Sequence, residues 1–192
     1  AQSRNMDNGF YYLKNQSMYF AIGFAIMLAL SFFDYHTLDK FKTLALILII
    51  ALMVAVVFWG VERNGAKRWL DFSKIGVPLS FQPSELAKFV LVLYMASFMS
   101  KRPQLMASFS HGIMPMLIIM GVFGILLLAQ KNMSMMVIMV MTGAVMLFFG
   151  GARMAHLVTL AGIATPVMVI AVLSEEYRKA RMTMFWDPWT SK

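Results

Sequence analysis

The sequence predicts an all-α integral membrane protein, a polytopic bundle of transmembrane helices. The 192 residues are 60% hydrophobic and only 14% charged, whereas soluble domains are about 45–50% apolar and about 25% charged. Several windows of 18 or more residues contain no Asp, Glu, Lys or Arg, which is the signature of membrane-spanning helices. These apolar runs are continuous and not alternating, and this pattern favours helices over the strands of a barrel.

Six spans are expected, and together they form a single membrane domain over residues 1–192. They cover residues 15–33, 43–61, 83–100, 113–129, 132–152 and 154–174. Each run can cross a hydrocarbon core of about 30 Å, since a helix rises about 1.5 Å per residue. Pro83 suits the first position of the third helix, where its missing N–H would have no partner. Pro115 and Pro166 are tolerable if neighbouring helices satisfy the carbonyls that they free.

The connecting segments alternate between two sides of the membrane. Side A holds residues 1–14, 62–82, 131 and 175–192, and side B holds 34–42, 101–111 and 153. Of the 17 Lys and Arg residues, 11 lie on side A, 5 on side B and one, Lys88, within a span. Taken alone, the positive-inside rule would place side A in the cytoplasm.

Composition also excludes several classes of function. The chain has no Cys, its three His residues are far apart, and no P-loop or G-x-G-x-x-G motif occurs, so no thiolate metal site or nucleotide fingerprint is expected. The net charge of +8 favours an anionic partner. Because most of the chain is committed to lipid, we expect a membrane-borne anion and no nucleic acid.

Two opposite charges, Glu85 and Lys88, stand where the third span begins. With Gln82 near the N-cap, Glu85 falls near N3, where a carboxylate complements the positive end of the helix dipole. Lys88 follows three residues later on the same face, within ion-pair reach. Either the pair only caps and anchors the helix, or both side chains line a polar cavity, as intramembrane charges usually do.

The preceding loop, "ERNGAKRWLDF", concentrates positive charge around an expected Asn-Gly turn at 64–65. Arg63, Lys67 and Arg68 could belong to a solvated loop, or they could bind a phosphate or pyrophosphate head group. Trp69 suits a position at the membrane interface.

These two stretches together, "NGAKRWLDF" and "FQPSELAKF", resemble the signature of the SEDS proteins (shape, elongation, division and sporulation), the FtsW, RodA and SpoVE group. The motif positions are Asn64, Gly65, Trp69, Gln82, Pro83 and Ser84. The segments "NGFYYLKNQ", "DYHTLDKF" and "EEYRKARMTMFWDPW" are also similar to family segments. The Asp-Pro-Trp ending looks more like FtsW or SpoVE than RodA.

The resemblance implies a glycosyltransferase of the bacterial cytoplasmic (inner) membrane with ten helices, of which this chain holds helices two to seven. Such proteins polymerise lipid II, an undecaprenyl-pyrophosphate-linked substrate, into peptidoglycan strands. The implied partners are a class B penicillin-binding transpeptidase and other division or sporulation membrane proteins, and the implied cofactor is a divalent metal, Mg or Mn. The resemblance also places side A outside the cytoplasm, against the charge count.

The resemblance assigns roles residue by residue. Glu85 and Lys88 would line the central cavity. The cations that would hold diphosphate or order the outer loop are Arg63, Lys67, Arg68, Arg178 and Arg181. The catalytic Asp of the family would lie beyond Lys192, and Asp187 is not that residue, so this fragment alone is expected to be inactive. One departure is at 130–132, where Gln-Lys-Asn replaces the frequent Gln-Pro-Asp.

Two other functions stay open. The chain could belong to a lipid II flippase or transporter, in which the intramembrane pair gates a substrate path. It could also be a membrane scaffold that only recruits the transpeptidase.

Overall fold

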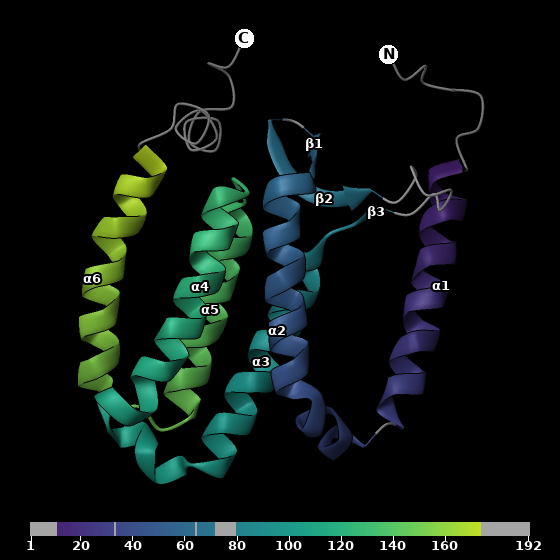
Figure 1. Cartoon of the computed structure of the whole chain (residues 1–192). Coiled ribbons are helices and arrows are strands. Elements are labelled where there is room, and N and C mark those ends of the chain that lie inside the picture. The colour runs from purple at the N-terminus through teal and green to yellow at the C-terminus, as the bar shows by residue number, and fades with distance from the viewer. Residues whose placement is uncertain (1–10, 33, 64, 72–79, 174–192) are drawn as a thin grey trace. The chain divides into compact units, whose positions relative to one another are not determined.

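The computed structural model describes residues 11–32, 34–63, 65–71 and 80–173 of the chain (Figure 1). The chain divides into two compact units, Ala1–Phe41 and Lys42–Lys192, and each is described by itself. Arg178, Arg181, Asn64 and the side chain of Arg63, all predicted site residues, lie outside what is described.

The first unit contains helix α1, Tyr11–Ser31, and the beginning of α2, Tyr35–Trp59. Asp34 starts α2, because its Oδ1 accepts the His36 N–H at 3.0 Å and its carbonyl accepts the Thr37 N–H at 3.0 Å. The prediction of a side-B loop over 34–42 is therefore wrong: all but its first residue is helical. The charges in this stretch suggested a loop, but a helix can extend past the apolar segment that it contains.

The second unit contains the rest of α2 and four further helices. These are α3 Pro83–Lys101, α4 Met114–Ala129, α5 Met133–Phe149 and α6 Met154–Leu173. With α1 and α2, the described residues form six long helices, and each overlaps one predicted span. By length and composition, two stretches qualify as membrane-crossing helices among the described residues, His36–Trp59 and Phe109–Ala129.

The apolar side chains of this unit meet in one core, in which α5 packs against α3, α4 and α6 (Figure 1). Met53 of α2, Leu91 and Met95 of α3, Phe123 of α4 and Met139 of α5 are almost fully buried there. Methionine is frequent in this core, and its unbranched side chain fills irregular gaps between helices.

A small three-stranded antiparallel sheet follows α2 on side A, where the sequence analysis expected only a loop. It consists of β1 Val61–Arg63, β2 Ala66–Asp71 and β3 Ser80–Phe81. Arg63 pairs with Ala66 across a tight turn, in which Gly65 has a φ of 74°, a left-handed conformation that glycine adopts without steric cost. Gly65 thus supports the predicted turn, and the fold is all-helical apart from these strands.

On side B, a 3₁₀ helix, η2 Pro103–Ala107, and a π-helical turn, η3 Phe109–Ile113, connect α3 to α4. Gly112 makes this connection possible. A β-carbon at position 112 would press against the backbone carbonyl of Leu105, well inside contact distance. The absence of a side chain therefore lets η3 fold back against η2.

Candidate functional site

The Gln-Pro-Ser-Glu motif forms the first turn of α3 on side A. Gln82 is the N-cap residue and Pro83 occupies the first helical position, as predicted, so Glu85 falls at N3. Ser84 is 1% exposed, and its Oγ accepts a hydrogen bond from Gln82 Nε2 at 2.9 Å. The turn thus directs Ser84 into the protein and leaves Glu85 exposed.

Glu85 and Lys88 form the ion pair that their spacing predicts, with Nζ 2.8 Å from Oε2. The glutamate side chain is 53% exposed and that of the lysine 32%. An exposed pair of this kind contributes only about 0–1 kcal/mol to stability. Because both side chains are partly exposed, both groups are accessible. The pair is not a buried ion pair on which the stability of the fold depends.

One cation of the basic hairpin, the partly buried Arg68, contacts another element of the fold. Arg68 on β2 donates from Nη2 to the backbone carbonyl of Lys131 at 2.6 Å, across 63 positions of sequence. Its Nε is shielded from solvent and has no partner among the described residues. Lys67, the neighbouring cation, is exposed and pairs in register with Glu62 of β1.

The turn between α4 and α5 completes this arrangement. Asn132 is 4% exposed and donates from Nδ2 to Ser84 Oγ at 3.3 Å. Gln130 is 1% exposed and donates from Nε2 to the Met53 carbonyl of α2 at 2.9 Å. Lys131 between them has a φ of 52°, an uncommon conformation for a residue with a β-carbon.

We name these five residues the side-A clamp: Arg68, Ser84, Gln130, Lys131 and Asn132. Their hydrogen bonds connect α2, β2, α3 and the α4–α5 turn. The departure from Gln-Pro-Asp also has a structural consequence here. Proline holds φ near −65°, so a proline at 131 could not adopt the observed turn, and an amide at 132 donates to Ser84 where an ionised carboxylate could only accept.

The structure brings some predicted site residues together and separates others. Arg68, Gln82 and Ser84 lie at the clamp. Glu85 follows Ser84 in the first turn of α3, and Lys88 lies one turn further along the helix. Lys67 stays on the exposed hairpin. Pro83 is buried and Trp69 is partly buried. The roles of Gln130 and Asn132 were not predicted. Gln130 matches the family motif and Asn132 departs from it, and neither observation indicated a hydrogen-bond partner.

The described residues do not form a centre for a divalent metal. Among them, no group of three or more His, Cys, Asp or Glu side chains is placed to hold a metal ion. The carboxylate at the start of α3, Glu85, is already paired with an ammonium group, which disfavours a second cation.

With this geometry in hand, the comparisons with known proteins decide the family. The family model for cell cycle proteins of the FtsW, RodA and SpoVE type matches residues 1–192. The chain belongs to the SEDS family. It is thus similar to bacterial membrane proteins, in agreement with its apolar helices.

Several SEDS relatives match nearly all of the chain. It is 35% identical to a probable peptidoglycan glycosyltransferase FtsW of Geobacter sp. (strain M18), over 97% of the chain and 50% of that protein. It is 34% identical to stage V sporulation protein E of Bacillus subtilis (strain 168), over 95% of the chain and 50% of that protein. The chain therefore spans about half the length of the curated relatives that it matches.

Two solved structures have a similar fold. One is a chain from a peptidoglycan synthase complex, with a TM-score of 0.72 and 26% identity over 92% of this chain and 51% of that one. The other is the rod shape determining protein RodA of Thermus thermophilus, with a TM-score of 0.67 and 25% identity over 84% and 49%. The helix arrangement described above is thus that of SEDS proteins.

Proposed function

We propose that this chain is part of a peptidoglycan glycosyltransferase that polymerises lipid II into glycan strands during cell division or sporulation. The observation that carries the proposal is the paired motif, hairpin and helix start, within a family match over the whole chain. The relatives named above as a probable peptidoglycan glycosyltransferase and a sporulation protein support this reaction and both settings.

The chemistry of side A suits an anionic lipid pyrophosphate. Polymerisation displaces such a leaving group, and cations placed at its oxygens stabilise the charge that develops in the transition state. Lys67, Lys88 and Lys131 are described cations here with accessible side chains. Glu85 holds Lys88 in place through their 2.8 Å contact. In this proposal Lys88 and Glu85 line the substrate path, and Lys67 attracts the substrate.

Arg68 has a different part in the proposal. Its guanidinium already bonds the Lys131 carbonyl, so binding diphosphate would require it to give up that bond. We assign Arg68 to positioning: it orders the α4–α5 turn against the hairpin. The roles predicted for the basic cluster were to hold diphosphate or to order the outer loop, and a contact with the α4–α5 turn was not predicted.

The protein would act as a multi-pass protein of the cytoplasmic membrane, with ten helices in the full protein and side A outward. Its proposed partner is a class B penicillin-binding transpeptidase, since one structurally similar chain comes from a complex that coordinates polymerization and crosslinking. Transport of lipid II and a purely recruiting role remain the competing functions.

Labelled lipid II separates these functions. The purified full-length protein should convert it into glycan strands in the absence of other polymerases, and residues 1–192 alone should not. A protein that moves lipid II across liposomes without making strands would instead be a transporter. A protein that does neither, but still binds the transpeptidase, would be a scaffold.

A further inference from the structure

A polar cavity of about 480 Å³, wide open to the surroundings and lined mostly by exposed residues, lies on side B, at the end of the helices away from the clamp. It is formed between the η2–η3 connection and the start of α6. Its lining residues are Gln104, Ala107, Ser108, Phe109, Arg153 and His156. None of them belongs to the family motifs or to the proposed lipid II site, so the cavity requires a separate explanation.

Among the described residues, the two cavity side chains that can carry a positive charge have no ion-pair partner. Within the described residues the guanidinium of Arg153 has no hydrogen bond or ion pair. His156 contacts the Phe109 ring edge-on at 5.5 Å, while its Nδ1 is shielded from solvent and has no partner among the described residues. No acidic residue occurs between positions 86 and 174, so this stretch supplies no counter-charge.

The backbone adds to the positive character of the cavity. The carbonyl of Arg153 accepts the N–H groups of His156 at 3.0 Å and Leu157 at 3.3 Å, so α6 begins at the cavity. The first N–H groups of a helix have no partner within it, and its dipole is positive at this end. The cavity thus combines an unpaired guanidinium, an imidazole and a helix N-terminus.

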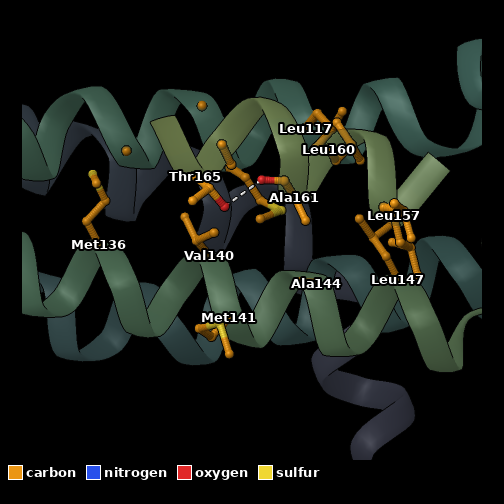
Figure 2. A pocket seen from close by; sticks show the side chains of 15 residues that line it. Leu117, Met136, Val140, Met141, Ala144, Leu147, Leu157, Leu160, Ala161 and Thr165 are labelled. Carbon is orange, nitrogen blue, oxygen red and sulfur yellow. Dashed lines mark hydrogen bonds between the residues drawn. The ribbon is translucent and has the colours of Figure 1, made fainter. Parts of the chain in front are cut away.

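An apolar groove begins beside the cavity. It has a volume of about 640 Å³ and lies between α4, α5 and α6. Leu117, Leu147 and Leu157, which line it, all come from the side-B ends of their helices, and Figure 2 shows Leu147 next to Leu157. On α6, His156 of the cavity is followed at intervals of four by Leu160 and Ala164 of the groove. Residues four apart share one helix face, so the cavity and the groove occupy the same face of α6.

From this arrangement we propose that the protein binds an anionic phospholipid on side B. The phosphate lies in the cavity against Arg153 and His156, and one acyl chain lies in the groove along Leu160 and Ala164. Basic pockets between membrane helices are known to take such head groups. The helix ends that surround the cavity place it at the level of the lipid phosphates.

The charges select among lipids. A zwitterionic head group would bring an ammonium group into a cavity that has two basic groups and no acidic residue nearby in sequence. A head group with net negative charge adds a phosphate, which can pair with the two basic groups, and adds no positive charge. A phosphorylated protein could offer the same phosphate, but it would leave the adjoining apolar groove without an occupant.

Native mass spectrometry of the delipidated full-length protein tests the head-group assignment. Dioleoyl-phosphatidylglycerol should bind at least about tenfold more tightly than dioleoyl-phosphatidylcholine, because both lipids carry the phosphate but only choline brings a second positive charge beside Arg153 and His156. Arg153→Gln should remove this preference. The matched control is Arg102→Gln on the same side, whose guanidinium lies over the Phe98 ring at 5.5 Å and lines no part of the cavity.

Equal losses in the two arginine variants would overturn the site. Inorganic phosphate that binds as tightly as the lipid would overturn the lipid assignment. If Arg153→Gln lowers the melting temperature, His156→Gln replaces it and should reduce the lipid preference by itself. The outcome does not depend on glycosyltransferase activity.

The groove has its own test. Ala164→Phe should weaken binding of dioleoyl-phosphatidylglycerol but not of the dihexanoyl form, whose chains are too short to fill the groove. Ile163→Phe is the control, since Ile163 is 62% exposed and does not line the groove. If Ala164→Phe instead lowers the melting temperature with lipid affinity unchanged, a protein helix occupies the groove and the acyl-chain placement is wrong.

Discussion

The two ends of the second unit use their polar side chains in opposite ways. On side A the clamp residues bond to one another and to backbone carbonyls: Arg68 to Lys131, Asn132 to Ser84 and Gln130 to Met53. On side B the polar groups of the cavity, Arg153 and His156, have no such partners among the described residues. Buried polar groups usually have hydrogen-bond partners within the protein, whereas Arg153 is exposed and His156 is partly buried, so both are accessible to a ligand.

The comparison separates positioning from binding. A cation that already donates to a carbonyl holds the backbone in place, and Arg68 is of this kind. A cation without a counter-charge is available to an anion, as Arg153 is on side B. Lys88 is intermediate between a positioning and a binding cation, because it is paired with Glu85 yet partly exposed. Composition alone would treat all three as equivalent positive charges.

The largest effect is expected on activity, from Glu85→Ala and Lys88→Ala in the full-length protein. Each should slow lipid II polymerisation by more than about tenfold, which corresponds to 1.4 kcal/mol of lost transition-state stabilisation. Stability should change by no more than about 1 kcal/mol, because exposed ion pairs contribute little. Polymerisation rate and melting temperature are measured together, with the side-B variant Arg102→Gln as control. Wild-type rates in both alanine variants would remove the pair from the substrate path.

Lys131→Pro should cause the largest loss of stability, about 3 kcal/mol. Proline cannot adopt the φ of 52°, and it removes the N–H that bonds the Leu128 carbonyl at 2.9 Å. Lys131→Gly should raise stability by about 0.5–1 kcal/mol, since glycine adopts this conformation without strain. Chemical denaturation in detergent compares the two variants. If proline is tolerated, the turn has the geometry of the Gln-Pro-Asp form.

Gly112→Ala probes the wall of the side-B cavity. The added methyl group would meet the Leu105 carbonyl, and overpacking of this kind costs about 1–3 kcal/mol. Gly124→Ala is the matched control, because a β-carbon at position 124 has nothing within 4 Å. The control should leave stability unchanged or raise it by up to about 1 kcal/mol. Equal melting temperatures for the two variants would show that η2 and η3 are not packed as described.

Arg68→Gln should destabilise the protein by about 1–2 kcal/mol, the cost of leaving the Lys131 carbonyl without its donor. Lys67→Gln, the adjacent exposed cation, should have an effect within about 0.5 kcal/mol. If Arg68 acts by positioning, its variant should lower the polymerisation rate without raising the apparent KM for lipid II. A raised KM with an unchanged rate would instead indicate direct contact with the substrate.

The sequence predicted those features that local pattern determines. Continuous apolar runs indicated each long helix, and Pro83 with Gln82 predicted the start of α3 to the residue. The three strands were not predicted, because they are short and polar and are stabilised only by pairing with one another. The clamp could not be predicted from the sequence. Gln130 and Met53, for example, are 77 positions apart, and no local sequence pattern indicates their contact. The spacing of Glu85 and Lys88 predicted their ion pair, but not its exposure.

The smallest effect concerns Asp34 of the first unit, a carboxylate whose hydrogen bond to the His36 N–H begins α2. The backbone N–H of His36, and then its side chain, hydrogen-bond this carboxylate and lower the pKa of Asp34 from 3.8. Because the pKa is lower in the folded state, the contribution to stability is complete above pH 3.8 and is lost as the pH falls through the folded value. The protection factor of the Thr37 amide, which is its exchange rate corrected for the intrinsic pH dependence of amide exchange, should therefore fall on acidification in the wild type. Asp34→Asn should keep the helix start, since asparagine also caps helices, while the pH dependence disappears. If the variant retains the pH dependence, another group titrates at this helix end, and Asp34 would no longer contrast with the unpaired Arg153.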